Sequence, residues 1–244
     1  MARTLVVGCS FVQHMHVYQD TEDFLIVGNS AAGNPSIAAT VLYYCSKETF
    51  QRVIVLWSGV NRIDIPVPIN LHQALPKDKN GYPKYIFYTE LGDVVWYHSG
   101  GYRPDGFKDP CPKFLQDLFT NQYRGTAPNS KYLSNLTLTA IINTQSILSV
   151  QGIQCDMSFI YDVNEQLDKN SASCGPLLKD SLLYHIVDWT KFVDVEPIYN
   201  QARSRRQLTT DEFHPTPQFM INWINHTFGV TLPTRPWNQY QGLK

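Results

Sequence analysis

Short apolar runs alternate with amphipathic stretches over the first third of the chain. Leu5–Val7, Phe24–Val27 and Val53–Trp57 are each short, apolar and followed by glycine or polar residues, which is typical of buried strands. Between the last two runs, Pro35–Phe50 carries apolar residues at helical spacing, and Pro35 suits the first turn of a helix. Strand, helix and strand in this order predict a parallel sheet built from βαβ units.

The middle of the chain has a different pattern. Prolines at positions 66, 68 and 76 open a stretch that we interpret as rich in loops. Tyr85–Tyr88 and Val94–His98 then alternate around a Glu-Leu-Gly-Asp turn, which predicts a β-hairpin. We therefore interpret residues 65–128 as an insertion within a single domain that spans 1–244. Insertions of this kind commonly shape a binding site.

Regular patterns return in the second half of the chain. Ser130–Val150 predicts a long helix, and Met157–Tyr161 predicts a buried strand. Leu177–Trp189 has a helical pattern, and Phe192–Val195 is interpreted as a short last strand. Pro217–Phe228 predicts a closing helix that begins at its proline. With the first third of the chain, these elements predict an α/β fold.

The composition mainly excludes classes of protein. Twenty Lys and Arg against 21 Asp and Glu give a formal net charge of −1, so nothing attracts nucleic acid or an anionic membrane in general. No apolar run is long enough to predict a membrane span, and the amino-terminal run is too short for a signal peptide, so we expect a cytoplasmic location. Five scattered cysteines without a CxxC pair predict buried thiols, and no cofactor or metal is implied. The sequence leaves the oligomeric state open.

Four short motifs fall where a parallel sheet would bring them together. Gly8–Phe11, Asn29–Asn34 and Ser58–Arg62 follow the first three predicted strands, and Asp211–Pro215 precedes the last helix. In an open α/β sheet, the loops beyond the carboxyl ends of the strands meet in one crevice. We therefore expect the side chains of these motifs to form one site.

The residue types in these motifs are those of acyl transfer. Ser10, in a tight turn from strand to helix, suits a nucleophile, and His214 suits the base that a hydroxyl nucleophile needs. Asp211 suits the group that orients the imidazole and stabilises its charged form. The backbone N–H groups of Ser10 and Gly33 and the side-chain amide of Asn61 are predicted to bind the oxyanion.

Two further residues are predicted to bind substrate. Arg62 suits a bidentate contact with a substrate carboxylate or phosphate, and Trp57 suits stacking on a sugar ring. An internal ion pair for Arg62 and core packing for Trp57 are the alternatives. His14 and His16 are two residues apart and would point to different faces of a helix, so we interpret them as surface or packing residues and predict no metal site.

Each catalytic assignment also has a purely structural alternative. Ser10 is well placed to cap the helix that follows it. Asp211 and Asn61 are residue types that favour turns. Gly33 is explained equally well by a backbone conformation that is closed to other residues.

Taken together, the motifs resemble those of the SGNH (GDSL-type) serine hydrolases. Gly8-Cys9-Ser10-Phe11 is similar to the first block of that superfamily, and Gly33 is similar to the glycine of the second. Gly59-Val60-Asn61 resembles the third block, and Asp211 to His214 resembles the final Asp-x-x-His. The resemblance implies a three-layer α/β/α sandwich with a mostly parallel sheet of about five strands. It also implies an esterase that acts through Ser10, His214 and Asp211.

The chain departs from the family pattern at two positions. Cys9 and Arg62 stand where the family usually has aspartate, although neither position supplies a catalytic atom in the usual mechanism. This version of the motifs resembles those of bacteriophage and marine bacterial proteins. The expected function is hydrolysis of a carboxylic ester, with a small molecule or an O-acetylated carbohydrate as substrate. The main alternative is a binding or structural module with the same fold, such as a virion component. A nucleotide-binding domain fits less well, because the glycine fingerprints are incomplete.

Overall fold

The computed structural model describes residues 3–13, 21–60, 62–73, 88–98, 131–162, 178–209 and 214–232. Its centre is a parallel sheet of four strands in the order β2-β1-β3-β7. The strands are β1 (Arg3–Gly8), β2 (Phe24–Gly28), β3 (Phe50–Trp57) and β7 (Gln154–Phe159). All three pairings between them are parallel. The predicted α/β fold with a parallel sheet is confirmed at this level.

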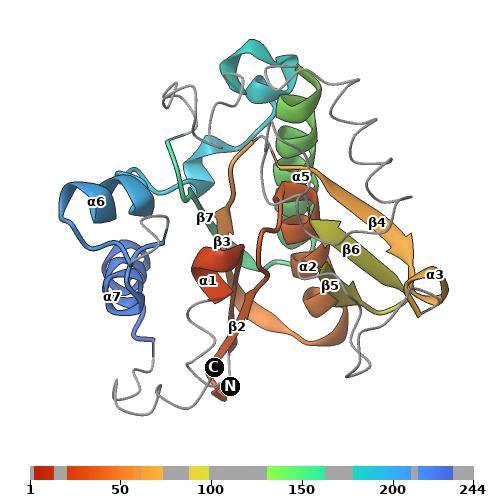
Figure 1. The fold of residues 1–244 in the computed structure, drawn as a ribbon, viewed down its shortest axis with the longest axis horizontal. Helices are drawn as coiled ribbons and strands as arrows, with labels where there is room; N and C mark the ends of the chain where they lie inside the picture. Colours follow the sequence, from red (N-terminus) through yellow and green to blue (C-terminus); the bar gives the residue numbers. More distant parts are fainter. Residues whose placement is uncertain are drawn as a thin grey trace.

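The two central strands form the core of the sheet. Leu5, Val6 and Val7 of β1 have no exposed surface, and neither has any residue from Val53 to Trp57 of β3. Strands that are covered on both faces are expected to be continuously apolar, which is why these short runs were recognisable in the sequence. Helices lie on both sides of the sheet in Figure 1, with α2 (Asn34–Lys47) and α5 (Lys131–Val150) on one side. The helices α6 (Ile198–Ser204) and α7 (Pro217–Phe228) lie on the other.

A second, antiparallel sheet lies on the outer side of α2 and α5 (Figure 1). Its strands are β4 (Asp64–Pro68), β6 (Val94–His98) and β5 (Tyr88–Leu91), in that order, and the short helix α3 (Ile69–Gln73) follows β4. The predicted hairpin is therefore present. Its first strand runs through Tyr88–Leu91, whereas residues 85–87 of the predicted strand lie outside the described ranges.

Strand β4 differs from the prediction that prolines 66 and 68 open a loop. Both prolines are exposed, and among the described strands β4 pairs with β6 alone. Proline is tolerated in such an edge strand, because its missing N–H is not needed by a neighbour. The described part of the predicted insertion thus includes most of a small sheet.

The segment Leu177–Trp189 differs from the prediction of one helix. It contains 3-10 helices at Leu178–Asp180 and Leu182–His185, and a third follows at Trp189–Lys191. The Ser181 hydroxyl accepts the Leu183 N–H, and the Asp188 carboxylate accepts the Thr190 N–H. Such local bonds from Ser and Asp side chains compete with a continuous α-helix.

Two further differences concern the end of the sheet. Phe192 makes an isolated parallel bridge to Met157, so the predicted strand Phe192–Val195 is reduced to one residue. Among the described residues the main sheet has four strands, where about five were expected. Helix α6 was not predicted. The closing helix α7 has the predicted bounds, with the Thr216 hydroxyl accepting the Phe219 N–H and Gly229 ending it at a φ of 60°.

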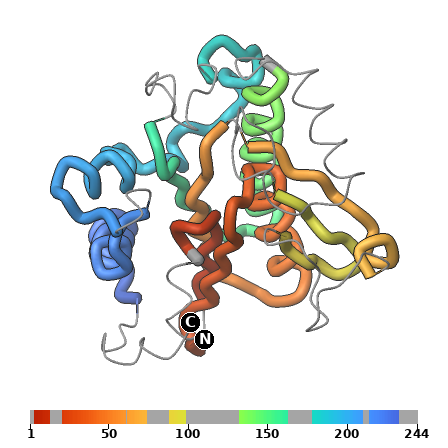
Figure 2. Tube along the Cα trace, in the orientation of Figure 1, coloured from red at the N-terminus to blue at the C-terminus, as the bar shows by residue number. Residues whose placement is uncertain are grey.

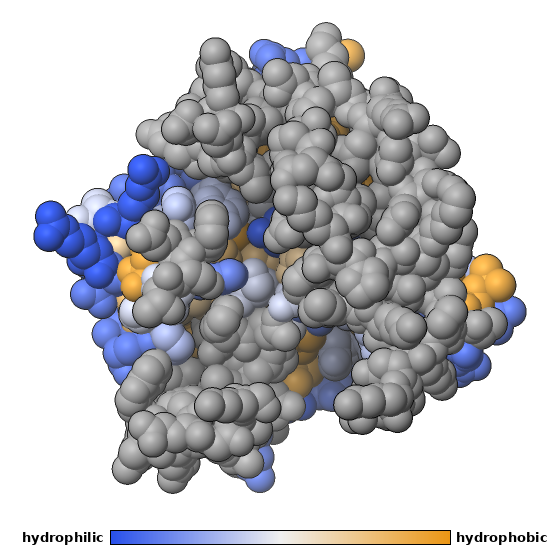
Figure 3. Space-filling view, viewed as in Figure 1, coloured by the Kyte–Doolittle hydropathy of each residue, from blue (hydrophilic) through white to orange (hydrophobic). Residues whose placement is uncertain are grey.

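Figure 2 shows how remote parts of the chain come together. The amino-terminal strand β1 lies at the centre, with the carboxy-terminal α7 on one side and α5 on the other. Within the described residues, no helix is both long and apolar enough to cross a membrane. The face drawn in Figure 3 is strongly hydrophilic beside α6, where Arg203–Arg206 is exposed.

Candidate active site

Ser10 lies at the carboxyl end of β1, where the chain turns at once into the short helix α1 (Ser10–Gln13). The turn is tight because Gly8 has no side chain: a Cβ there would lie 2.5 Å from Val12 Cγ2 and 3.1 Å from the Leu56 carbonyl oxygen. As the first residue of α1, Ser10 has a backbone N–H in the helical turn whose N–H groups lack intrahelical acceptors. Ser10 is 8% exposed.

His214 reaches Ser10 from the other end of the chain. The distance from His214 Nε2 to Ser10 Oγ is 3.0 Å. A neutral imidazole that carries its proton on Nδ1 accepts the Ser10 O–H at Nε2. This is the geometry in which a histidine can take the proton of a serine hydroxyl as it attacks. Among the described residues, the Ser10 hydroxyl is bonded to this histidine and not to a backbone N–H of α1, so the capping alternative is not supported.

The backbone around His214 is held by hydrogen bonds between residues 207–209 and residues 214–216. Leu208 and Pro215 form an antiparallel bridge, and the Thr216 N–H donates to the Gln207 carbonyl at 2.8 Å. The His214 carbonyl accepts both the N–H and the hydroxyl of Thr209, at 2.7 and 3.1 Å.

The imidazole of His214 also packs against an aromatic neighbour. Its ring centroid lies 5.3 Å from that of Phe11, the residue after Ser10. Phe11 has no exposed surface and contacts the ring of Tyr161 edge-on at 5.5 Å. The helix that carries Ser10 therefore also supplies the surface on which His214 rests.

The loops after β2 and β3 are joined through Asn34. Its Oδ1 accepts the Ser58 N–H at 2.8 Å, and its Nδ2 donates to the Ser58 carbonyl at 3.2 Å. The same Nδ2 donates to Thr137 Oγ1 of α5 at 3.0 Å. The Asn29 N–H donates to the Gly8 carbonyl, which places the second loop beside the turn that carries Ser10. Three of the four predicted motifs thus adjoin one another, as expected for one sheet edge.

The backbone N–H of Gly33 is not free to bind an oxyanion. It donates to Asp64 Oδ1 at 2.9 Å in a buried hydrogen bond. The prediction that Gly33 is an oxyanion donor is therefore wrong for this conformation. Gly33 has φ −90° and ψ 178°, so it is not required for an unusual backbone conformation either. It is required by close packing, because a Cβ would lie 2.8 Å from Asp64 Oδ2 and 3.0 Å from Arg62 Cβ.

Several predicted residues cannot be placed. Asp211 and Asn61 lie outside the described residues, and so do His14 and His16. The structure therefore does not test the orienting acid of the triad, the side-chain donor of the oxyanion hole or the interpretation of the two histidines. Within the described ranges, no group of three or more His, Cys, Asp or Glu could hold a metal ion.

The two predicted substrate-binding residues have different environments. Trp57 has no exposed surface and belongs to the core of β3, so core packing accounts for it and stacking on a sugar does not. Arg62 is half-buried, and its Nη1 donates to the Ala32 carbonyl at 3.1 Å. Its expected internal carboxylate partner is not found among the described residues.

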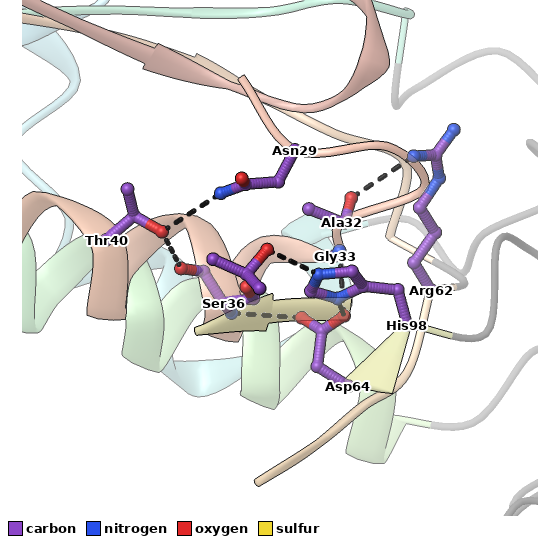
Figure 4. Close-up of polar contacts among 9 residues, drawn as sticks. Asn29, Ala32, Gly33, Ser36, Thr40, Arg62, Asp64 and His98 are labelled. Atoms are coloured by element: carbon purple, nitrogen blue, oxygen red, sulfur yellow. Dashed lines mark hydrogen bonds and ion pairs between the residues drawn. The ribbon is translucent and has the colours of Figure 1, made fainter. Parts of the chain in front are cut away.

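A buried polar network beside the site was not predicted from the sequence (Figure 4). Asp64 Oδ1 lies 2.9 Å from His98 Nδ1, and both side chains have no exposed surface. Asp64 Oδ2 accepts the Ser36 N–H at 2.9 Å, so the carboxylate binds Gly33 and Ser36 at the amino end of α2. A carboxylate can only accept, so the His98 ring donates from Nδ1, and its Nε2 lies 2.9 Å from the Thr89 hydroxyl oxygen.

One signal in the sequence pointed to this network. Asp64 stands between Ile63 and Ile65, and an acid within an apolar run is expected to be buried with partners. The network links the antiparallel sheet to the loop that follows β2.

The chain was compared with family models, curated proteins and solved structures. None of them matches. The resemblance to SGNH hydrolases therefore depends on the four motifs alone, and any function has to be argued from the geometry of the site.

Ala31 provides a test of strain in the second loop. It has φ +62°, at the third position of a turn closed by the Ala32 N–H donating to the Asn29 carbonyl. An L-residue in this region costs about 1–2 kcal/mol, and glycine costs about 0.4–1 kcal/mol of additional unfolded-state entropy. Ala31→Gly is therefore expected to raise the free energy of unfolding by about 0.5–1 kcal/mol, measured by urea denaturation.

The matched control for this prediction is Ala39→Gly in α2. Glycine inside a helix is expected to lower the free energy of unfolding by about 1 kcal/mol, so the two substitutions should have opposite signs. Destabilisation by both would show that the turn does not strain Ala31.

Proposed function

We propose that this protein is a serine hydrolase that cleaves a carboxylic ester, with the fold and mechanism of the SGNH hydrolases. The observation that carries the proposal is the 3.0 Å hydrogen bond between Ser10 Oγ and His214 Nε2. These residues are 204 positions apart, and both lie in motifs that the sequence analysis had assigned to nucleophile and base. A nucleophile and a base within hydrogen-bond distance are the minimum that acyl transfer requires.

The proposed reaction proceeds through an acyl-enzyme. Ser10 Oγ attacks the ester carbonyl while His214 Nε2 takes its proton, and the tetrahedral intermediate then expels the alcohol, which receives that proton from His214. Water, deprotonated by His214, attacks the acyl-enzyme and releases the acid and free Ser10. Asp211 is proposed to accept the Nδ1 proton of His214 and keep the required tautomer.

The oxyanion hole is proposed to have fewer donors than the sequence suggested. With the Gly33 N–H committed to Asp64, the Ser10 N–H and the Asn61 side-chain amide are the proposed donors. Loss of a single donor typically costs about 10²–10³ in turnover, so a two-donor site is expected to be slow compared with a three-donor site. Short acyl esters, including O-acetyl groups on carbohydrates, are the proposed substrates.

The alternative is a binding or structural module that retains the fold, such as a virion component. The Gly33–Asp64 hydrogen bond is the observation that favours it, because it occupies a group that the catalytic version needs. Cys9, buried where the family usually has aspartate, is consistent with either function.

A fluorophosphonate probe distinguishes the two functions. An activated serine attacks the phosphorus and becomes covalently labelled, so we expect one equivalent of label on the peptide that contains Ser10. Ser10→Ala should take up none, and Ser46→Ala, which alters an exposed serine at the end of α2, should be labelled like the wild type. Absence of labelling from the wild type, together with saturable binding of a glycan, would support the binding module instead.

A further inference from the structure

Arg62 is a half-buried cation without an anionic partner among the described residues. One of its N–H groups, at Nη1, is occupied by the Ala32 carbonyl at 3.1 Å. The nearest acid in the sequence is Asp64, whose carboxylate is already bonded to Gly33, Ser36 and His98. In Figure 4 the guanidinium of Arg62 points away from that network. A partly exposed guanidinium with no carboxylate partner among the described residues is free in charge to bind an anion from solution.

Arg62 is connected to the proposed catalytic pair through neighbouring side chains. Its Cβ packs against Gly33, where an added methyl group would lie 3.0 Å from it. Burial raises the pKa of the Tyr161 hydroxyl, and the guanidinium of Arg62 nearby acts in the opposite direction. Tyr161 in turn contacts Phe11, and Phe11 contacts the ring of His214. Arg62, Tyr161, Phe11 and His214 thus form a continuous series of neighbours that ends at Ser10.

We propose that Arg62 binds a carboxylate group of the substrate, so that the ester hydrolysed at Ser10 is an anionic one. A guanidinium donates from several N–H groups in one plane, and two parallel bonds to a carboxylate add both energy and orientation. The bonds to the Ala32 carbonyl and to the Tyr161 side chain fix Arg62 in advance, and because a guanidinium has five N–H donors, others remain for the ligand. This inference rests on the proposed function for the reaction, but the binding of the anion is testable without turnover.

The kinetic test uses two pairs of esters that differ in charge. The first pair, mono-4-nitrophenyl adipate and 4-nitrophenyl hexanoate, places the carboxylate in the acyl group. The second pair, 4-carboxyphenyl acetate and its methyl ester, places it in the leaving alcohol. For one of the two anionic esters, Arg62→Gln is expected to lower kcat/KM by about 10- to 100-fold, the effect of losing hydrogen bonds to a charged group. Turnover of the neutral esters should change by less than about threefold.

Two variants show whether the effect is specific. Arg62→Lys keeps the charge but not the fork, and should retain part of the preference for the anionic ester. Arg3→Gln removes an arginine that is paired with Glu48 at the opposite end of β1, and should leave the preference unchanged. Equal losses on neutral and anionic esters in Arg62→Gln would overturn the proposal, since they would show that Arg62 only holds the Ala32 loop.

A binding measurement separates this inference from the proposed reaction. In the Ser10→Ala background, calorimetric titration of both pairs should show that at least one anionic ester binds more tightly than its neutral counterpart, and Arg62→Gln should weaken binding of that anion by about 10-fold or more. If the wild type neither hydrolyses esters nor takes up the fluorophosphonate, the proposed function fails, and this titration still decides whether Arg62 binds a carboxylate. Equal affinity for the anionic and the neutral ester in both pairs would overturn the anion site alone.

Discussion

Ser10→Ala and His214→Gln are each expected to lower kcat for a short 4-nitrophenyl ester by about 10³-fold or more. The first removes the proposed nucleophile, and the second removes the nitrogen that lies 3.0 Å from it. Both substitutions are nearly isosteric and affect residues outside the central strands, so the melting temperature should change by only a few degrees. Steady-state hydrolysis and thermal unfolding of the same preparations are the measurements.

The double variant makes this prediction sharper. Residues that act as one unit have non-additive effects, so Ser10→Ala combined with His214→Gln should be about as slow as either single variant. Ser46→Ala and His226→Gln alter an exposed serine and an exposed histidine, and should retain full activity. If the double variant lost activity by the product of the two single losses, Ser10 and His214 would not act together. Normal turnover in either single variant would show the same.

Asp64→Ala is expected to lower the free energy of unfolding by about 3 kcal/mol or more, because it leaves several buried hydrogen-bond donors without an acceptor. Three donors lose their acceptor at once, namely the N–H groups of Gly33 and Ser36 and the His98 ring. Each buried donor that is left unsatisfied costs about 1–3 kcal/mol. Urea denaturation followed by circular dichroism measures the loss.

Two matched variants accompany this measurement. Asp64→Asn keeps one acceptor oxygen and should therefore be less destabilising than alanine. Asp93→Asn changes an exposed acid in the turn between β5 and β6, and should alter the free energy of unfolding by less than about 0.5 kcal/mol. If Asp64→Ala unfolds within 1 kcal/mol of the wild type, water or another group must replace the carboxylate, and the network does not hold the second loop.

The fold prediction succeeded for the elements that are most deeply buried. Strands β1 and β3 are covered on both faces, so their sequences are unbroken apolar runs, and α7 begins and ends with the capping residues that the sequence shows. The prediction failed where side-chain hydrogen bonds to the backbone, or a position at the edge of a sheet, outweighed the hydrophobic pattern. Ser181 and Asp188 divide a helical pattern into 3-10 turns, and prolines 66 and 68 concealed an edge strand.

The candidate site was predictable only in part. The proximity of Ser10 to His214 followed from motif order and from the rule that loops meet at the carboxyl edge of a parallel sheet. The commitment of the Gly33 N–H to Asp64 did not follow, because it depends on how the antiparallel sheet places a carboxylate against α2. Long-range hydrogen bonds of that kind leave no periodic pattern in the sequence.

The separation of Ser10 from His214 along the chain also has a consequence for biosynthesis. At about 5–20 residues per second, the ribosome needs roughly 10–40 s to add the 204 residues that separate the pair. Throughout that interval the nascent polypeptide carries Ser10 without His214. On the proposed mechanism, Ser10 would therefore become activated late, as the carboxy-terminal segment docks, and the growing chain would be protected from premature acylation.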